Sequence, residues 1–473
     1  MQQTTVVRAR TRSRTRTEVA FAAAAAALVA IAFAVPRILS EEWRQHLYAA
    51  SAPIFGIWGP HLGWGTGPAI AIAAAVVVIG PDLARRLPWR QLLVGSWLAA
   101  VAWTFALSMI DGWQVGFAGR LTRQHEYLYE VPGVHDIPAM LRGFSDRILD
   151  FQPDSWTTHV SGHPPGALLA FVLLDRVGLG GGAWAGWLCV LVGCSAAAAV
   201  PVALKALGAP EHARAATPFL VLAPAAVWVA VSADAFFAGV AAWGIALLAM
   251  ATRLRPGWPV IAGAAGSLLG FGLYLNYGLV LMAIPAGAVL VARGFRPAVP
   301  ALLGVALVVA AFSTAGFWWL DGYHLVVQRY YQGIAAERPY SYWVWGNLAA
   351  TVCAVGLATV AAAPAAPRGL AIRDLTAPSW AAGTPMTTQL RQRLYCWRTT
   401  VDPVALLAAA ATVAILAADL SGLSKAETER IWLPFEIWLL GATALLPRPA
   451  VRSWLAVQAV AALLINSLLM TNW

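Results

Sequence analysis

The chain has 473 residues, of which 60% are hydrophobic and only 11% charged, and its formal net charge is +10. Soluble domains carry about 25% charged residues, so this composition excludes a soluble globular protein. The basic residues are scattered between apolar runs, which excludes a nucleic-acid-binding domain and indicates the positive-inside bias of a membrane protein.

Apolar runs of roughly 17 to 25 residues, the length that a helix needs to cross a bilayer core, recur along the whole chain. A transmembrane β-barrel would show short alternating segments instead. We therefore predict an all-α, polytopic integral membrane protein with about 13 transmembrane helices. The predicted spans are 18–36, 66–81, 92–110, 183–204, 215–230, 233–252, 258–273, 276–293, 298–317, 345–363, 403–419, 432–447 and 453–470.

The N-terminal segment combines a basic tail with an Ala-rich apolar run, and no small-x-small cleavage site follows before residues 36–44. We expect a retained first helix whose tail is cytoplasmic, which places nearly all the short Arg-rich loops on the cytoplasmic side. The expected units are a tail at 1–17, N-terminal helices at 18–91, a transmembrane core at 92–363 with an external loop at 111–163, a cytoplasmic loop at 364–402, and C-terminal helices at 403–473.

The stretch "VSGHPPGALL", residues 160–169, opens an apolar run of only about 15 residues at 164–178. That length is short for a span. Counting it as a span would also move every later basic loop to the outside, against the positive-inside rule. We therefore expect this segment to lie along the outer face or to dip partly inward.

The external loop 111–163 contains seven carboxylates, most of which we expect to be solvated. Two differ from the rest. Asp111 stands where a helix meets the interface, and Glu126 is embedded in the aromatic stretch "HEYLY". A half-desolvated carboxylate in such a place can be tuned toward general-base catalysis.

These features together resemble GT-C glycosyltransferases, especially the branch of the protein O-mannosyltransferases and the lipid-A aminoarabinose transferases. Three features follow one another in the family's order: an acidic residue after a membrane helix, then an interfacial segment, then a His-Pro-Pro step. "VSADAFF" resembles its Ser-Pro-Asp turn, "GLYLNYG" its Lys/Asn-Tyr break, and "KAETERIWLP" its Arg-Tyr-x-Leu-Pro segment. The likeness covers 111–300 and 419–447. The chain departs from it with His125 where many relatives have Asp, and with Gly166 where Leu is frequent.

The resemblance implies an inverting transfer of a sugar from a polyprenyl-phosphate donor to an envelope glycan, lipid or protein acceptor. The core 92–363 would then be catalytic. Either Asp111 or Glu126 would be the general base, with Asp111 slightly favoured. His163, Lys425 and Arg430 would bind the donor phosphate, and His163 could alternatively ligate a metal. A divalent cation would serve as a Lewis acid, but no compact ligand motif is present and the metal stays open.

A second external segment, 318–344, is rich in aromatic residues. Its Tyr and Trp side chains are typical either of sugar-stacking surfaces or of an interfacial aromatic belt. The residues that we assign to substrate binding are Arg329, Glu337, Arg338, Tyr340 and Trp343.

Two other functions remain open. One is a transporter or flippase for lipid-linked or small solutes. Transporters tend to carry ionisable residues at mid-span and internal repeats, whereas the predicted span interiors are nearly free of charge and no inverted repeat is apparent in the sequence. The other is a noncatalytic scaffold for envelope assembly. In each case we expect a multi-pass protein of a bacterial plasma membrane with its active face outside. The cysteines form no CxxC pair and are expected to be packing residues: Cys189, Cys194, Cys353 and Cys396.

Overall fold

The computed structural model describes residues 2–371, 386–388, 397–398 and 400–471, and this part of the chain is mostly helical. Within these described residues, eight helices are long and apolar enough to cross a membrane, or up to 10 if each of two bent helix pairs counts as one span. The protein is therefore an integral, multi-pass membrane protein.

The longer helices are α1 (Gln2–Ile38), α3 (Thr66–Arg86), α4 (Trp89–Ser108), α8 (Pro165–Arg176), α9 (Gly182–Cys194), α10 (Ala196–Ala206), α11 (Pro210–Val221), α13 (Ala233–Ala251), α14 (Trp258–Leu275), α15 (Ala283–Arg293), α16 (Ala298–Thr314), α17 (Trp319–Gln332), α18 (Tyr340–Val355), α22 (Pro403–Leu420), α24 (Leu433–Leu440) and α25 (Val451–Leu468). The short helices are α2 (Glu41–Gln45), α5 (Tyr127–Glu130), α6 (Ile137–Arg142), α7 (Thr158–Ser161), α12 (Ala226–Val229), α19 (Leu357–Ala362), α20 (Ala366–Leu370) and α23 (Thr428–Ile431).

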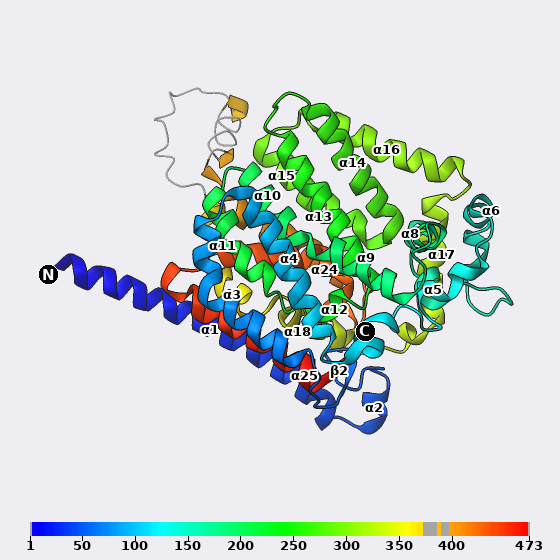
Figure 1. Cartoon of the computed structure of the whole chain (residues 1–473), viewed down its shortest axis with the longest axis horizontal. Helices are drawn as coiled ribbons and strands as arrows, with labels where there is room; N and C mark the ends of the chain where they lie inside the picture. The colour runs from blue at the N-terminus through cyan, green and yellow to red at the C-terminus, as the bar shows by residue number, and fades with distance from the viewer. Residues whose placement is uncertain (1, 372–385, 389–396, 399, 472–473) are drawn as a thin grey trace.

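Helix α13 occupies the centre of the bundle and packs against α9, α10, α14 and α24 (Figure 1). Most of its side chains are buried, and many of them are alanine or glycine. Small residues let membrane helices approach closely, which is how such helices gain packing energy in lipid. Helices α3, α4 and α25 pack together, whereas α1 lies against α18 and α19.

The expected count of about 13 spans is not reached, although every predicted span falls on helical segments. Residues 183–204 lie in one candidate span, Gly182–Ala206. The segments Tyr277–Arg293 and Leu433–Leu445 are apolar but shorter than 18 residues. Residues 215–230 are divided between α11 and α12. Apolar runs thus located the helices correctly, but they overstated the number that cross by themselves.

Two of the predicted spans are bent at glycines. Helices α16 and α17 meet at 75°, and α18 meets the segment Leu357–Leu370 at 98°. Gly316 and Gly356 lie at these breaks with φ of +103° and +78°, a backbone conformation that other residues rarely adopt. The predicted external loop 318–344 is therefore largely the helix α17, turned sharply away from α16.

One end of the bundle carries α2, α5, α6, α17 and β2, while the N-terminus lies on the opposite side (Figure 1). We call this the loop end. Here residues 39–65, which we call the strap, connect α1 to α3. Within the strap, β1 (Gly56–Trp58) pairs antiparallel with β2 (Leu469–Thr471) at the end of the chain. This small sheet was not expected from the sequence.

Helix α8 begins at the two prolines, with Pro164 as its N-cap and Pro165 in its first turn. Proline suits this position because the first helical N–H groups have no partner within the helix. Its 12 residues span about 18 Å at 1.5 Å per residue, which is too short to cross a bilayer core. The helix packs against α5 and α14.

Gly166 allows this packing, and replacing it is expected to destabilise the protein. A Cβ at Gly166 would lie 2.5 Å from the backbone carbonyl oxygen of Tyr274 on α14, a distance that forces the two helices apart. Gly166→Ala should therefore lower the free energy of unfolding by about 1–3 kcal/mol, the usual cost of overpacking. The measurement is the thermal unfolding midpoint of the protein in nanodiscs.

The matched control is Gly287→Ala in α15, where nothing lies within 4 Å of the added Cβ. This variant should keep or slightly raise the midpoint, because alanine favours helix over glycine. An unchanged midpoint in Gly166→Ala would show that α8 and α14 can separate without cost.

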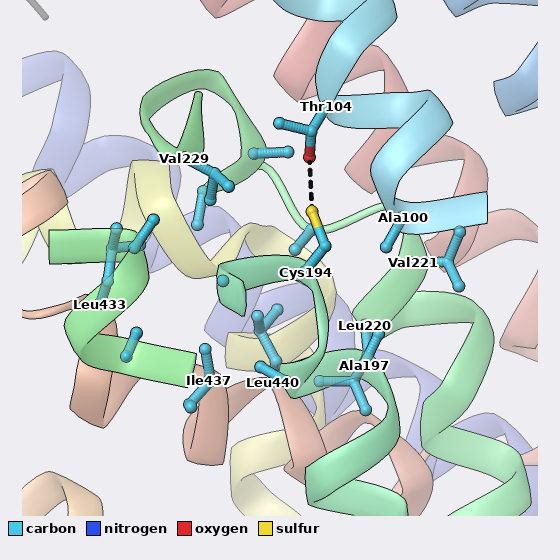
Figure 2. A pocket seen from close by; sticks show the side chains of 17 residues that line it. Ala100, Thr104, Cys194, Ala197, Leu220, Val221, Val229, Leu433, Ile437 and Leu440 are labelled. Atoms are coloured by element: carbon cyan, nitrogen blue, oxygen red, sulfur yellow. Dashed lines mark hydrogen bonds between the residues drawn. The ribbon is translucent and has the colours of Figure 1, made fainter. Parts of the chain in front are cut away.

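The bundle also contains an apolar cavity of about 50 Å³ between α4, the α9–α10 helices, α13 and α24 (Figure 2). At the wall of this cavity, Oγ1 of Thr104 lies 3.3 Å from Sγ of Cys194. Cys189, Cys194 and Cys353 are free thiols, as expected of packing residues, whereas Cys396 lies outside the described residues. Much of the predicted loop 364–402 also lies outside the described residues; helix α20 belongs to the part of this loop that the structure describes.

Candidate functional site

Four segments that are distant in the sequence meet in one buried cluster. Glu126 comes from the external loop and precedes α5; its Oε1 lies 3.6 Å from Nε2 of His159 on α7. The backbone N–H of His159 donates to the carbonyl of His125, which ties α7 to the loop. His163, between α7 and α8, donates through Nδ1 to the carbonyl of His159 at 2.8 Å. A carbonyl only accepts, so Nδ1 carries the proton.

The other half of the cluster is an ionic network around Arg430 on α23. Its Nη1 lies 2.6 Å from Oδ2 of Asp234, at the start of α13, and its Nη2 lies 2.6 Å from Oε2 of Glu427. Ser232 caps α13 and donates its hydroxyl to the same Asp234 oxygen. Arg430 and Asp234 are buried, and a buried charge requires such partners. The network therefore holds α13 and α23 together.

Glu126 lies within electrostatic reach of this network. Burial raises its pKa to about 8, against the lowering effect of Arg430. Burial lowers the pKa of His159 and that of His163, because it disfavours the charged imidazolium. For His163, the charge of Asp234 opposes this lowering. At neutral pH Glu126 is thus mostly a neutral carboxylic acid, and both imidazoles are neutral.

Asp111 forms a second group, with a partner from the strap. Its Oδ1 lies 2.6 Å from Nε2 of His61, whose Nδ1 lies 2.7 Å from the carbonyl of Gly59. Burial raises the pKa of Asp111, whereas His61 and Arg120 oppose that rise. The site therefore contains a carboxylate that is paired with an imidazole and lies within the electrostatic reach of a guanidinium.

Arg120 connects the two groups electrostatically, because its charge acts on both Asp111 and Glu126. It is buried, and it donates to the carbonyls of Val115 and Thr471 at 2.5 and 2.7 Å. Burial lowers its pKa to about 10, so it stays charged at neutral pH. Asp111 and Glu126 thus belong to one electrostatic region.

Lys425 and Arg430, which we expected at the donor phosphate, are both engaged by protein groups. Lys425 Nζ donates to the carbonyl of Ala335 at 2.9 Å. Of the two neighbouring acids, Glu427 pairs with Arg430, whereas Glu429 points toward the strap and accepts from the backbone N–H of Phe55 at 2.9 Å. Burial raises the pKa of Glu429 to about 7.

The residues that we assigned to substrate binding are distributed over several contacts. Arg329 on α17 pairs with Asp150 and donates to the Ser161 hydroxyl, which fastens α17 to the external loop. Glu337 accepts from the Tyr48 hydroxyl in the strap. These contacts place both residues at the loop end, beside the segments that form the site.

The other three assigned residues pack against the late loop and the strap. The Arg338 side chain is buried, and its Nη1 lies 3.3 Å from Oε1 of Glu427. The same nitrogen donates to the carbonyl of Lys425. The Tyr340 hydroxyl lies 3.4 Å from the carbonyl of Asp419. Trp343 is 0% exposed and packs with strap residues. Because a fully buried ring has no free face for a sugar, Trp343 is a packing residue here.

His61 and Arg120 are the site residues that reasoning from the sequence missed. His61 lies 50 positions before Asp111, in a segment to which the sequence assigned no role. Arg120 had no feature that separated it from other arginines of the loop. Two contacts of the strap bring His61 to Asp111: its pairing with the chain end, and the backbone N–H of Gly65, which donates to the carbonyl of Met109 at 3.3 Å. No local pattern encodes these contacts.

The part of the chain that the structure describes contains no group of three or more His, Cys, Asp or Glu side chains arranged to hold a metal ion. A polar cavity of about 330 Å³ lies apart from the site, where the α10–α11 turn meets the start of α22. His212 and Asp402 line this cavity, and Nδ1 of His212 lies 3.5 Å from Oδ2 of Asp402.

Comparison with known proteins gives one distant likeness. No family model matches the chain, and no curated protein matches it. Among solved structures, it is similar to an oligosaccharyltransferase from Archaeoglobus fulgidus that was solved tethered to an acceptor peptide containing the NVT sequon, with a TM-score of 0.41 and 10% sequence identity. The likeness covers 77% of this chain and 50% of that one, so this chain matches about half the length of that protein.

Proposed function

We propose that the protein is a GT-C-type glycosyltransferase that transfers a sugar from a polyprenyl-phosphate donor to an envelope glycan, lipid or protein acceptor on the outer face of a bacterial plasma membrane. One observation carries the proposal. The segments with family-like motifs, around Glu126, His163, Asp234 and Arg430, lie far apart in the sequence, yet their side chains form one buried cluster at the loop end.

Asp111 is the base in this proposal. The acceptor hydroxyl attacks the anomeric carbon as the bond from that carbon to the phosphate oxygen breaks, which inverts the configuration. Asp111 takes the hydroxyl proton, and the polyprenyl phosphate leaves with the bonding electron pair. A buried carboxylate with a raised pKa suits this task because a base works best with a pKa near the ambient pH.

Glu126, His163 and Arg430 act on the donor phosphate. Glu126 is mostly protonated at neutral pH, so it does not repel a phosphate and can donate a hydrogen bond to it. His163 presents Nε2 and donates there only as an imidazolium, a form that a bound phosphate favours. Arg430 supplies a permanent positive charge. No step of this proposal passes through a metal ion.

The test uses the full chain in nanodiscs, supplied with a panel of polyprenyl-phosphate sugars and candidate acceptors. The expected result is a glycosylated acceptor with the configuration at the anomeric carbon inverted, and an equal amount of released polyprenyl phosphate. Turnover of no donor would contradict the proposal.

One observation favours a transporter as the second candidate. Glu436 lies in the apolar helix α24 and is fully buried, and ionisable side chains within membrane helices often mark transport pathways. Proteoliposomes containing labelled lipid-linked sugar separate the two functions. Movement of label across the bilayer without any transfer, abolished in Glu436→Gln, would support transport.

The role of Glu126 can be decided by comparing two substitutions. If Glu126 donates a hydrogen bond as a neutral acid, Glu126→Gln should retain most of the transfer rate, because the amide also donates. Glu126→Ala should lose about tenfold or more, as expected when a donor to a charged group is removed. The measurement is kcat for sugar transfer at pH 7. Equal, large losses in both variants would instead assign general-base catalysis to Glu126.

A further inference from the structure

The strap places one histidine directly on Asp111. The Nε2 atom of His61 lies 2.6 Å from Oδ1 of Asp111, and its side chain is 21% exposed while that of Asp111 is 8% exposed. The imidazole is therefore the more exposed partner of the pair. His61 comes from the N-terminal part of the chain, outside the segments that resemble GT-C enzymes.

The hydrogen bonds of His61 require a proton in this contact. Its Nδ1 faces the carbonyl of Gly59 at 2.7 Å, and a carbonyl only accepts, so Nδ1 donates. An ionised carboxylate also only accepts, so a 2.6 Å contact with Nε2 needs a second proton on the imidazole or on Asp111. The pair thus shares one proton and is neutral as a whole.

Arg120 acts on the Asp111 side of this contact: burial raises the pKa of Asp111, and the positive charge of Arg120 opposes that rise. Within the described residues, His61 and Arg120 are the charged or titratable groups that act most strongly on Asp111, and each stabilises the ionised carboxylate. The two groups that accept from Arg120 are backbone carbonyls, of Val115 and Thr471, so its positive charge is not cancelled there. Both His61 and Arg120 therefore act against burial and stabilise the ionised carboxylate.

The backbone holds His61 in place from the other end of the chain. The backbone N–H of His61 donates to the carbonyl of Ser467 at 2.8 Å, and the backbone N–H of Gly59 donates to the carbonyl of Leu468 at 3.0 Å. The strands β1 and β2 continue this pairing to Thr471, whose carbonyl accepts from Arg120. The end of the chain therefore positions the backbone of His61 and the guanidinium of Arg120.

We propose that His61 is the positioning residue of the base: as an imidazolium it keeps the Asp111 carboxylate ionised and oriented, with its second oxygen available to the acceptor hydroxyl. This inference rests on the proposed sugar transfer. Asp111 remains the group that takes the acceptor proton.

The first test is the pH profile of transfer. Loss of the imidazolium makes the carboxylate protonate at higher pH, so the acid limb of kcat in His61→Gln should move upward by about one unit or more. At a pH on the acid limb of both proteins the rate of the variant should then be about tenfold below that of wild type, the two rates should approach each other at high pH, and the donor KM should stay unchanged. The matched control is His46→Gln, which changes an exposed histidine of the same strap.

The second test needs no substrate. Diethylpyrocarbonate modifies neutral imidazoles, and modification of each histidine is followed by mass spectrometry in wild type and Asp111→Asn. His61 should react about tenfold faster in the variant at the same pH, because the carboxylate that favours the imidazolium is gone. His46 serves as the internal reference and should react equally in both proteins.

The two tests separate the possible failures. Equal modification of His61 in both proteins overturns the pairing, whether or not any sugar is transferred. An acid limb that stays in place in an active His61→Gln protein overturns the positioning role while the proposed function stands. Absence of transfer by the wild type contradicts the proposed function, and the modification rates then decide the pairing by themselves.

Discussion

Asp111→Asn is expected to lower the rate of sugar transfer by about 10²- to 10⁴-fold, the usual contribution of a positioned general base. Asparagine keeps the size of the side chain and can still hydrogen-bond to Nε2 of His61 by donating from its amide, but it cannot take a proton from the acceptor. Because the step that is lost is chemical, kcat should fall while the KM for the donor changes little. The measurement is steady-state transfer in nanodiscs across a pH series.

The pH dependence of the wild type follows from the same assignment. A base acts in its ionised form, so the rate should rise with pH and level off above the pKa of Asp111, which burial raises. The residual rate of Asp111→Asn should lack this rise. The control is Asp146→Asn, at an exposed acid of the same loop, which should retain wild-type activity. Full activity in Asp111→Asn would remove Asp111 from the mechanism.

Arg430→Met is expected to be the most destabilising single change in the site. It leaves Asp234 and Glu427 without the cation that both contact at 2.6 Å. Breaking a buried ion pair from one side costs about 3–5 kcal/mol, because an uncompensated charge stays in the interior. The thermal unfolding midpoint in nanodiscs should therefore fall sharply.

A second substitution separates loss of charge pairing from loss of packing. Asp234→Asn combined with Arg430→Met removes one stranded charge, so the double variant should be more stable than Arg430→Met alone. Arg448→Met, at an exposed arginine near α25, is the matched control and should change the midpoint little. An Arg430→Met protein as stable as wild type would show that the network does not hold α13 and α23 together.

Much of the architecture could be predicted from local sequence. Apolar runs located the helices because a lipid environment demands long apolar segments. The apolar run after the two prolines was expected not to cross, and α8 indeed has only 12 residues. The same reasoning overstated the number of spans, since hydropathy does not register a bend at Gly316 or Gly356 or a helix that ends early.

The sequence singled out site residues by motif or by residue type, whereas their contacts depend on the fold. The motifs directed attention to Glu126, His163 and Arg430, and the structure gathers these side chains with Asp234. Trp343 was chosen for its ring, but its environment is a packed cluster with the strap, which its own neighbours in sequence do not reveal.

By itself, the sequence determined that this chain is a helical membrane protein and where its helices lie, because hydrophobic length and helix-breaking residues act locally. Only the tertiary structure decided which polar groups meet. The pairing of the strap with the last residues of the chain brings His61 to Asp111, and α13 brings Asp234 to Arg430. Such contacts join residues 50 to 196 positions apart, and a buried charge is stabilised by whatever partner the fold places beside it, not by its neighbours in sequence.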